Sequence, residues 1–159
     1  MKWWLTLIIA SCIAFRLMLE NTAKTFEEIN IGDTLGPEEI HVSKERCRAY
    51  ARQSHLDAAR FTDDEGARKE GLPGMILPGN MSLGLITKLV TDWIGNANAR
   101  VRRIGTTYRL PVQPDHTFVL QGFVTNSNPV ERTVEVDLWM ENEDAERLVI
   151  GTATVVFAK

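Results

Sequence analysis

His55 and Asp57, which lie on either side of Leu56, have side chains of the types that transfer protons in enzymes. An imidazole and a carboxylate are groups with which many enzymes activate a water molecule and return its proton. In an extended chain both would point away from the side on which Leu56 lies. The alternative is a solvated loop in which neither residue has a chemical role, which is the more frequent situation for such residues.

The other histidines and the two cysteines form no recognisable metal site. His41, His55 and His116 are scattered without the spacing of metal ligands. Cys12 lies in an apolar N-terminal run, and Cys47 lies in a predicted helix, where we expect it to be buried as a small apolar side chain. The sequence therefore predicts no metal and no disulfide framework.

Length and composition limit the class of protein. The 159 residues suggest one domain with a substantial core. Hydrophobic residues make up 44% of the chain and charged residues 25%, which is typical of a globular protein. The net charge of −3 provides no basic field, and no DNA- or RNA-binding motif is visible. We therefore expect no nucleic-acid partner.

Residues 1–25 form an N-terminal extension in which Trp3 to Phe15 is mostly apolar. The run resembles a short signal segment, yet it is shorter than the ~20 apolar residues that cross a membrane. A translation start at Met18, or a helix that docks on the domain, also explains it. We expect a cytoplasmic protein, with a membrane-associated or exported protein as the alternative if the run is a true signal.

Two short helices are predicted in the first half of the domain. Ser43 is a good N-cap for a helix that runs from Lys44 to about Gln53. After a polar loop, Asp63 or Asp64 can cap a second helix that ends near Gly71.

A long helix and five strands complete the prediction. The helix, about Asn80 to Ile94, carries apolar side chains on most of its faces, so we expect it to be buried. Strands are predicted at about residues 38–43, 100–110, 117–125, 132–141 and 148–157, and some of them alternate apolar and polar side chains. A buried helix followed by antiparallel strands predicts an α+β architecture, with a curved sheet wrapped around the helix.

Several motifs together resemble a known family. Tyr108–Pro114 resembles the R-F-x-x-P-V-x-P-G-D segment of MaoC-like (R)-specific enoyl-CoA hydratases and acyl dehydratases, and Gly151–Val155 resembles their G-x-A-x-V ending. The segment Ser54–Leu85 resembles their catalytic loop and helix start without a gap. The matched residues there are Asp63, Ala67, Gly71, Leu72, Ile76 and Gly79. The resemblance covers residues 26–159 and implies one domain of the hot-dog fold.

The family resemblance also implies ligands and partners. Members bind acyl thioesters of coenzyme A or acyl-carrier protein, and many add water reversibly across a 2-enoyl double bond. Coenzyme A would then enter as part of the substrate, and no separate cofactor is expected. The resemblance further implies a homodimer with the acyl tunnel between its two domains. A heterodimer with a subunit that keeps the catalytic pair is the alternative.

The residues that transfer protons in this family are replaced here. The Asp position is Leu56 and the His position is Phe61, and neither side chain can move a proton. The Asn-Pro between them is replaced by Ala58-Ala59. A displaced pair made of His55 and Asp57 remains a hypothesis for the catalytic residues, although the ungapped match on both sides opposes a slip.

Four further residues are candidates for binding the thioester. The N–H of Gly79 can polarise a thioester carbonyl at the helix start, or the glycine permits a tight turn. Asn80 can bond the same carbonyl or satisfy backbone groups. Asp63 matches an acidic family position but is better explained as a helix cap. Arg109, in a run of arginines, suits coenzyme A phosphates, with a solvated face as the alternative.

Three functions follow from these residues. The first is a hydro-lyase, an enoyl-thioester hydratase or 3-hydroxyacyl dehydratase with a rearranged site, which the family resemblance favours. The second is an acyl-thioester-binding or partner subunit without hydratase chemistry, which Leu56 and Phe61 favour. The third is a thioesterase, which ranks last because the long helix offers one carboxylate, Asp92, near its far end. Whether the protein is an enzyme stays open at this point.

Overall fold

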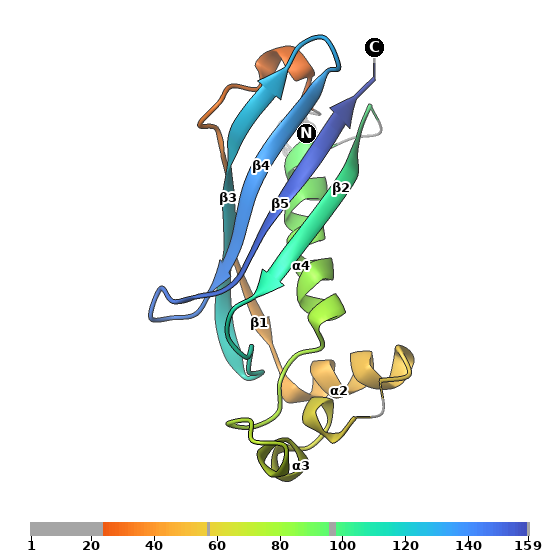
Figure 1. Cartoon of the computed structure of the whole chain (residues 1–159), viewed down its shortest axis with the longest axis vertical. Helices are drawn as coiled ribbons and strands as arrows, with labels where there is room; N and C mark the ends of the chain where they lie inside the picture. Colours follow the sequence, from red (N-terminus) through yellow and green to blue (C-terminus); the bar gives the residue numbers. More distant parts are fainter. Residues whose placement is uncertain (1–23, 57, 96–97, 159) are drawn as a thin grey trace, which may run out of the picture.

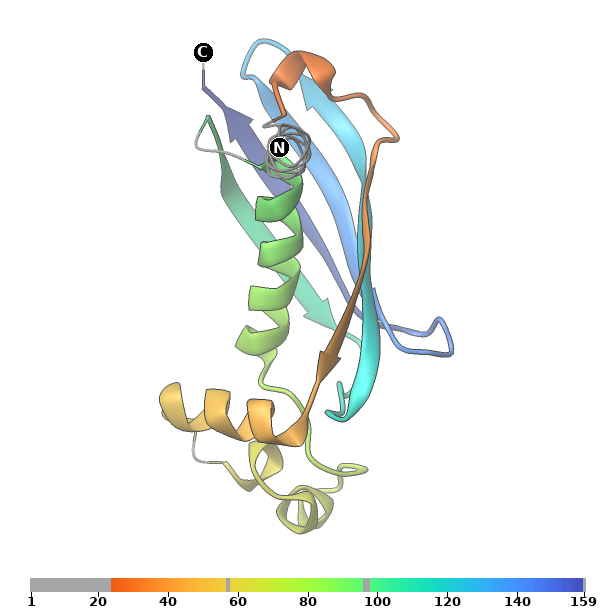
Figure 2. The ribbon, with the colours of Figure 1, turned by 180° about the vertical axis from the view of Figure 1, so that it is seen from behind.

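The computed structural model describes residues 24–56, 58–95 and 98–158. One long helix, α4 (Gly79–Ile94), lies along one face of a five-stranded sheet (Figure 1). Shorter helices gather beyond the end of the sheet at which α4 begins (Figure 2). The α+β architecture predicted from the sequence is therefore confirmed. The interpretations of residues 1–23 lie outside the described residues.

The sheet has the strand order β1-β3-β4-β5-β2, and every neighbouring pair is antiparallel. Its strands are β1 (Thr34–Val42), β2 (Ala99–Tyr108), β3 (His116–Asn128), β4 (Thr133–Glu141) and β5 (Arg147–Phe157). β1 starts at Thr34, earlier than the predicted residue 38. The sequence pattern missed this start because the pairing of β1 with β3 shifts register between Leu35 and Glu38. Such a bulge interrupts the alternation of side chains that identifies a strand in a sequence.

The core lies between α4 and the sheet. α4 contacts β1, β2, β3 and β4. Its buried apolar side chains are Met81, Leu85, Ile86, Leu89, Val90 and Ile94. They share one core with sheet residues such as Phe118, Leu120 and Val136. Full burial of such a side chain contributes about 1.5–3 kcal/mol to folding, so the helix is held mainly by this contact.

One stripe of α4 remains uncovered in the single chain. Asn80, Gly84, Lys88 and Thr91 are all exposed, and their spacings of three and four residues place them on one helix face. Figure 2 shows α4 from this uncovered side. The expectation of a helix surrounded by apolar side chains is corrected: polar and small residues form one full stripe, and the sheet covers the opposite side.

The two ends of α4 are set by residues that stop a helix. Pro78 is the N-cap residue, with φ −55° and ψ 136°. Gly95 follows the last residue with φ 76°, a left-handed conformation that glycine adopts without steric cost, and its N–H donates to the Thr91 carbonyl at 3.1 Å. The predicted extent of the helix is confirmed to within one residue.

The shorter helices are η1 (Phe26–Glu28), α2 (Lys44–Gln53), η2 (Ala59–Phe61) and α3 (Asp64–Lys69). The predicted N-cap of α2 is confirmed, because Ser43 Oγ accepts a hydrogen bond from the Arg46 N–H at 3.1 Å. Asp63, and not Asp64, caps α3, since its carboxylate accepts from the Gly66 N–H at 2.5 Å. α2 and α3 contact η2 and hold it at the end of the molecule where α4 begins, whereas η1 lies at the opposite end (Figure 2).

Candidate functional site

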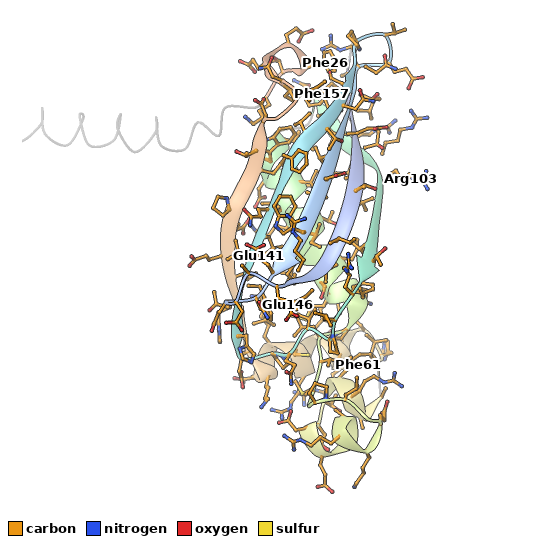
Figure 3. The ribbon with its side chains drawn as sticks, turned by 60° about the vertical axis from the view of Figure 1, so that its left-hand side comes forward. Phe26, Phe61, Arg103, Glu141, Glu146 and Phe157 are labelled. Carbon is orange, nitrogen blue, oxygen red and sulfur yellow. The ribbon has the colours of Figure 1, made fainter. Side chains whose placement is uncertain are left out.

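A cleft of about 370 Å³ lies at the start of α4, within the usual range for small-molecule sites. Three segments form it: the η2 loop, the first turn of α4, and the chain that leaves β2. The residues that line it are Arg60, Phe61, Ile76, Leu77, Gly79, Ser82, Tyr108, Arg109, Leu110, Pro111 and Val112. Figure 3 shows Phe61 at the end of the molecule where the short helices gather.

Hydrogen bonds between these segments fix the walls of the cleft. The Ile76 N–H donates to the Arg60 carbonyl at 2.9 Å, and the Leu77 N–H donates to the Val112 carbonyl at 2.7 Å. The Cys47 thiol of α2 donates to the Ile76 carbonyl, with Sγ at 3.5 Å from the oxygen. The residues just before α4 are therefore tied both to the loop that carries Phe61 and to the chain after β2.

A second hollow, of about 500 Å³, lies on the opposite face of the sheet, around Phe123 and Trp139. Successive strand residues point to opposite faces, and Leu138 beside Trp139 is buried in the core. The hollow is larger, but it contains neither the helix start nor the residues of the η2 loop. The cleft at α4 is therefore the better candidate for chemistry.

Gly79 and Tyr108 contact each other at the start of α4. The Tyr108 hydroxyl donates to the Gly79 carbonyl at 2.5 Å. A Cβ atom on residue 79 would lie 2.9 Å from Tyr108 Cζ, so the close approach of the ring requires glycine. The N–H of Gly79 is the first of the helix and has no acceptor within it. It carries the positive end of the helix dipole, which attracts an oxygen with negative charge.

Ser82 lies one helical turn after Gly79 and also lines the cleft. The side chain is fully buried, and among the described residues its Oγ has no hydrogen-bond partner. Sequence reasoning missed this residue and gave Tyr108 no functional role. The signal available for Ser82 was its spacing of three residues from Gly79, which places both on one helix face.

The residues considered for proton transfer differ in where they lie relative to the cleft. His55 is exposed at the end of α2, with φ 54°, and it does not line the cleft. Asp57 lies outside the described residues. Leu56 is half-buried, and its N–H donates to the Ala51 carbonyl at 2.9 Å. Phe61 does line the cleft, so a phenyl ring stands on a wall where the family resemblance places an imidazole.

The four candidate binding residues divide into two groups. Gly79 and Arg109 line the cleft, and Arg109 is exposed. Asp63 and Asn80 are not among the lining residues. The capping role of Asp63 is confirmed by its bond to the Gly66 N–H, and Asn80 lies on the exposed stripe of α4.

Charges near the cleft come mainly from arginines. Arg60 lies 5.8 Å from the ring centre of Phe61 and forms an ion pair with Glu70 at 2.8 Å. Burial raises the pKa of the nearby Cys47 thiol to about 11, so it stays protonated at neutral pH. No lining residue in the described chain is a carboxylate or an imidazole. Nor do the described residues bring three histidine, cysteine or acidic side chains together as metal ligands.

Comparison with protein families identifies the domain. The model of the MaoC like domain matches residues 25–144 of the chain. The chain belongs to the MaoC-like family. Solved structures of this family and of (R)-hydratases are similar to it, which confirms the hot-dog fold expected from the motifs. Comparison with curated proteins gives no significant match.

Three of the similar structures illustrate how far their sequences and folds agree with those of this chain. The (R)-hydratase from A. caviae involved in PHA biosynthesis is 14% identical with a TM-score of 0.75, and the match covers 82% of this chain and 98% of that one. The ChsH1–ChsH2 complex from Mycobacterium tuberculosis is 20% identical with a TM-score of 0.72, covering 80% and 98%. The truncated HadBC complex, a 3R-hydroxyacyl-ACP dehydratase from the same organism, is 18% identical with a TM-score of 0.67, covering 81% and 98%. At these identities the likeness establishes the fold.

Within residues 24–56, 58–95 and 98–158, no helix combines the length and the apolar character needed to cross a bilayer.

Proposed function

We propose that this MaoC-like protein binds acyl thioesters of coenzyme A or acyl-carrier protein in the cleft at α4, in the cytoplasm, and does not hydrate them by the usual route of its family. The observation that carries the proposal is the pairing of Gly79 at the helix start with Phe61 on the facing wall. The N–H of Gly79 suits a thioester oxygen. Phe61 stands where hydration would need an imidazole.

The cleft offers a place for each part of an acyl thioester. The N–H of Gly79, at the positive end of α4, suits the thioester oxygen. Phe61, Ile76 and Leu77 supply apolar surface for the acyl chain. Arg109 is exposed at the rim and suits a phosphate group of the carrier, because a guanidinium matches phosphate geometry.

Hydration of an enoyl thioester needs a group that takes a proton from water and a group that returns one. Arginine stays charged and aliphatic side chains do not titrate, so among the lining residues the hydroxyls of Ser82 and Tyr108 are the groups that both donate and accept a hydrogen bond. The Tyr108 hydroxyl is engaged with the Gly79 carbonyl, and no carboxylate or imidazole among the lining residues stands beside either hydroxyl to act as a base. Hydrolysis of a thioester would need a carboxylate of α4 in the cleft. Asp92 does not supply it, because it is paired with Lys88 near the far end of α4.

The proposal is tested with crotonyl-coenzyme A on the purified full chain. Isothermal titration calorimetry should show binding, and the absorbance of the enoyl thioester should stay constant in the presence of the protein. Binding with robust hydration would overturn the claim about Leu56 and Phe61. The absence of binding, to this ligand and to butyryl-coenzyme A, would overturn the binding proposal itself.

Two glycines of α4 provide a matched pair of variants. Gly79→Ala places a methyl group 2.9 Å from the Tyr108 ring, which must then move within the cleft. We expect roughly tenfold weaker binding, the equivalent of one lost hydrogen bond. Gly84→Ala adds the same methyl group at an exposed helix position with no atom within 4 Å. Its affinity should equal that of the native chain.

A role as one subunit of a dimer is the second candidate, and the edge strands favour it. β1 and β2 are the two edges of the sheet. Both edge strands contain a register shift, but β1 also carries Pro37, which has no N–H to donate to another strand, and β2 carries no proline. β2 is the freer edge, and the exposed stripe of α4 lies on the uncovered side of the helix.

Light scattering after size-exclusion chromatography should give about twice the 17.9 kDa mass of one chain. A monomer at micromolar concentration would contradict a homodimer and leave a heterodimer to be tested by mixing with candidate partners.

A further inference from the structure

We propose that Ser82 is a specificity-determining residue, whose hydroxyl bonds an oxygen atom carried by the acyl chain at C3, two carbons beyond the thioester carbonyl. The inference rests on the proposed binding of acyl thioesters and adds which acyl groups the cleft prefers. It begins from the buried Ser82 Oγ, which has no partner among the described residues.

A serine inside a helix normally satisfies its hydroxyl locally, by donating to the carbonyl three or four residues earlier. For Ser82 these acceptors are the carbonyls of Gly79 and Pro78. The Pro78 oxygen already accepts from the N–H groups of Met81 at 2.9 Å and of Ser82 itself at 3.3 Å. A carbonyl oxygen has two lone pairs, so this acceptor is fully used.

Both lone pairs of the Gly79 carbonyl are used as well. Within α4 this carbonyl accepts the helical hydrogen bond from the Leu83 N–H, and the Tyr108 hydroxyl donates to it at 2.5 Å from outside the helix. Tyr108 therefore takes the second local acceptor that Ser82 would use. The Ser82 hydroxyl is left without a local partner while it lines a cleft, and a buried hydroxyl in that state costs free energy until a ligand or water satisfies it.

The place of Ser82 along α4 decides which ligand atom it meets. Residues three positions apart on a helix are neighbours on one face, so Ser82 lies one turn deeper than Gly79. A thioester oxygen held at the Gly79 N–H points the acyl chain along this face. The next polar position of an acyl chain that lies there is an oxygen on C3, as in a 3-hydroxyacyl or 3-oxoacyl thioester. A saturated acyl chain leaves the Ser82 hydroxyl unsatisfied.

The test compares two ligands that differ by one oxygen, 3-hydroxybutyryl-coenzyme A and butyryl-coenzyme A, by isothermal titration calorimetry. Both enantiomers of the first are titrated separately. The full native chain should bind at least one enantiomer about two- to tenfold more tightly than the saturated ligand, the effect of one hydrogen bond. In Ser82→Ala this ratio should fall to about one, with the affinity for butyryl-coenzyme A unchanged.

Thr87→Val is the matched control. It removes a hydroxyl from the same helix, but the Thr87 hydroxyl is already satisfied by the Leu83 carbonyl at 2.7 Å and does not line the cleft. The preference should survive in this variant. Ser82→Cys, which keeps the size of the side chain with a weaker donor, serves as a second test should Ser82→Ala fold poorly, and its ratio should lie between those of the native chain and one.

Each other result has a distinct meaning. If the native chain binds neither ligand, the proposed function fails and this inference fails with it. If it binds both equally, or if Ser82→Ala keeps the preference, the inference about Ser82 is wrong and the proposed function stands. An equal loss of affinity for both ligands in Ser82→Ala would place the hydroxyl at the thioester itself and overturn the assignment to C3.

Discussion

Phe61 marks where this chain departs from the chemistry of its family. The departure is local, because the surrounding backbone retains a shape that the family's residues can adopt. Ala58 has φ −66° and ψ 133°, the extended conformation that a residue before proline requires. Ala59 is the first residue of η2, a position that tolerates proline. The native loop can therefore accept the family's Asn-Pro without rearrangement.

This geometry makes restoration of the loop a direct prediction. The combined variant Leu56→Asp, Ala58→Asn, Ala59→Pro and Phe61→His should gain hydration of crotonyl-coenzyme A. A positioned acid–base pair contributes about 10²- to 10⁴-fold to rate, so the gain over the native chain should be of that order. A folded variant without any gain would show that the cleft lacks more than the proton-transfer pair.

Tyr108 provides a second prediction at the residue scale. Tyr108→Phe removes the hydroxyl that occupies the Gly79 carbonyl, and Ser82 Oγ then gains a local acceptor. The preference for 3-hydroxybutyryl- over butyryl-coenzyme A should fall toward one, although Ser82 itself is unchanged. An undiminished preference in titration calorimetry would refute this positioning role of Tyr108.

Residue roles were the hardest part to predict from the sequence. Gly79 and Arg109 were expected at the ligand and do line the cleft, because their motifs fix them at the helix start and after β2. Ser82 was missed because its role depends on which acceptors its neighbours have used, and Tyr108 comes from a strand distant in sequence. His55 was a candidate by residue type, but the left-handed turn at the end of α2 leaves it exposed.

At the scale of elements, capping residues and apolar periodicity were sufficient for most of the fold. Ser43 and Gly95 mark helix ends through interactions within a few residues, so the sequence contains the whole signal. The early start of β1 was missed because its bulge breaks the period of two. The exposed stripe of α4 was underestimated, because its small and threonine residues resemble core residues in composition.

Asp64 connects two of these elements and gives a prediction on pH. Its carboxylate accepts from the Met75 N–H at 2.9 Å and pairs with Lys44 of α2 at 2.9 Å. These contacts, the backbone bond first, hold the pKa of Asp64 below its ordinary value. A lowered pKa in the folded state stabilises the protein above the unfolded value of 3.8, and this contribution is lost as the pH falls through the folded pKa.

The corresponding measurement is urea unfolding of Asp64→Asn and the native chain over a series of pH values. The variant should be less stable at pH 7, and the difference in unfolding free energy should shrink as the solution is acidified below pH 3.8. Glu65→Gln removes an exposed carboxylate that pairs with Lys69 and should change stability little, since exposed ion pairs contribute little. A difference for Asp64→Asn that is constant with pH would contradict the linkage.

At the scale of the whole molecule, the candidate cleft is formed by three segments far apart in the sequence: the η2 loop, the start of α4 and the chain that leaves β2. The family and the wrapped helix were predictable because several weak motifs agreed in order and spacing along the whole domain. The cleft itself was not, because its volume depends on how the η2 loop packs against the chain after β2. That packing is fixed by contacts such as the Leu77 N–H to the Val112 carbonyl, which pair residues distant in sequence.

A crystal structure of the full chain with bound butyryl-coenzyme A tests the central claim most directly. The thioester oxygen should lie within hydrogen-bond distance of the Gly79 N–H, with the acyl chain against Phe61 and no carboxylate or imidazole of this chain near C2 and C3. A thioester bound elsewhere, such as the hollow at Trp139, would contradict the assignment of the cleft. A histidine or aspartate of this chain beside C2 and C3 would contradict the absence of hydratase chemistry.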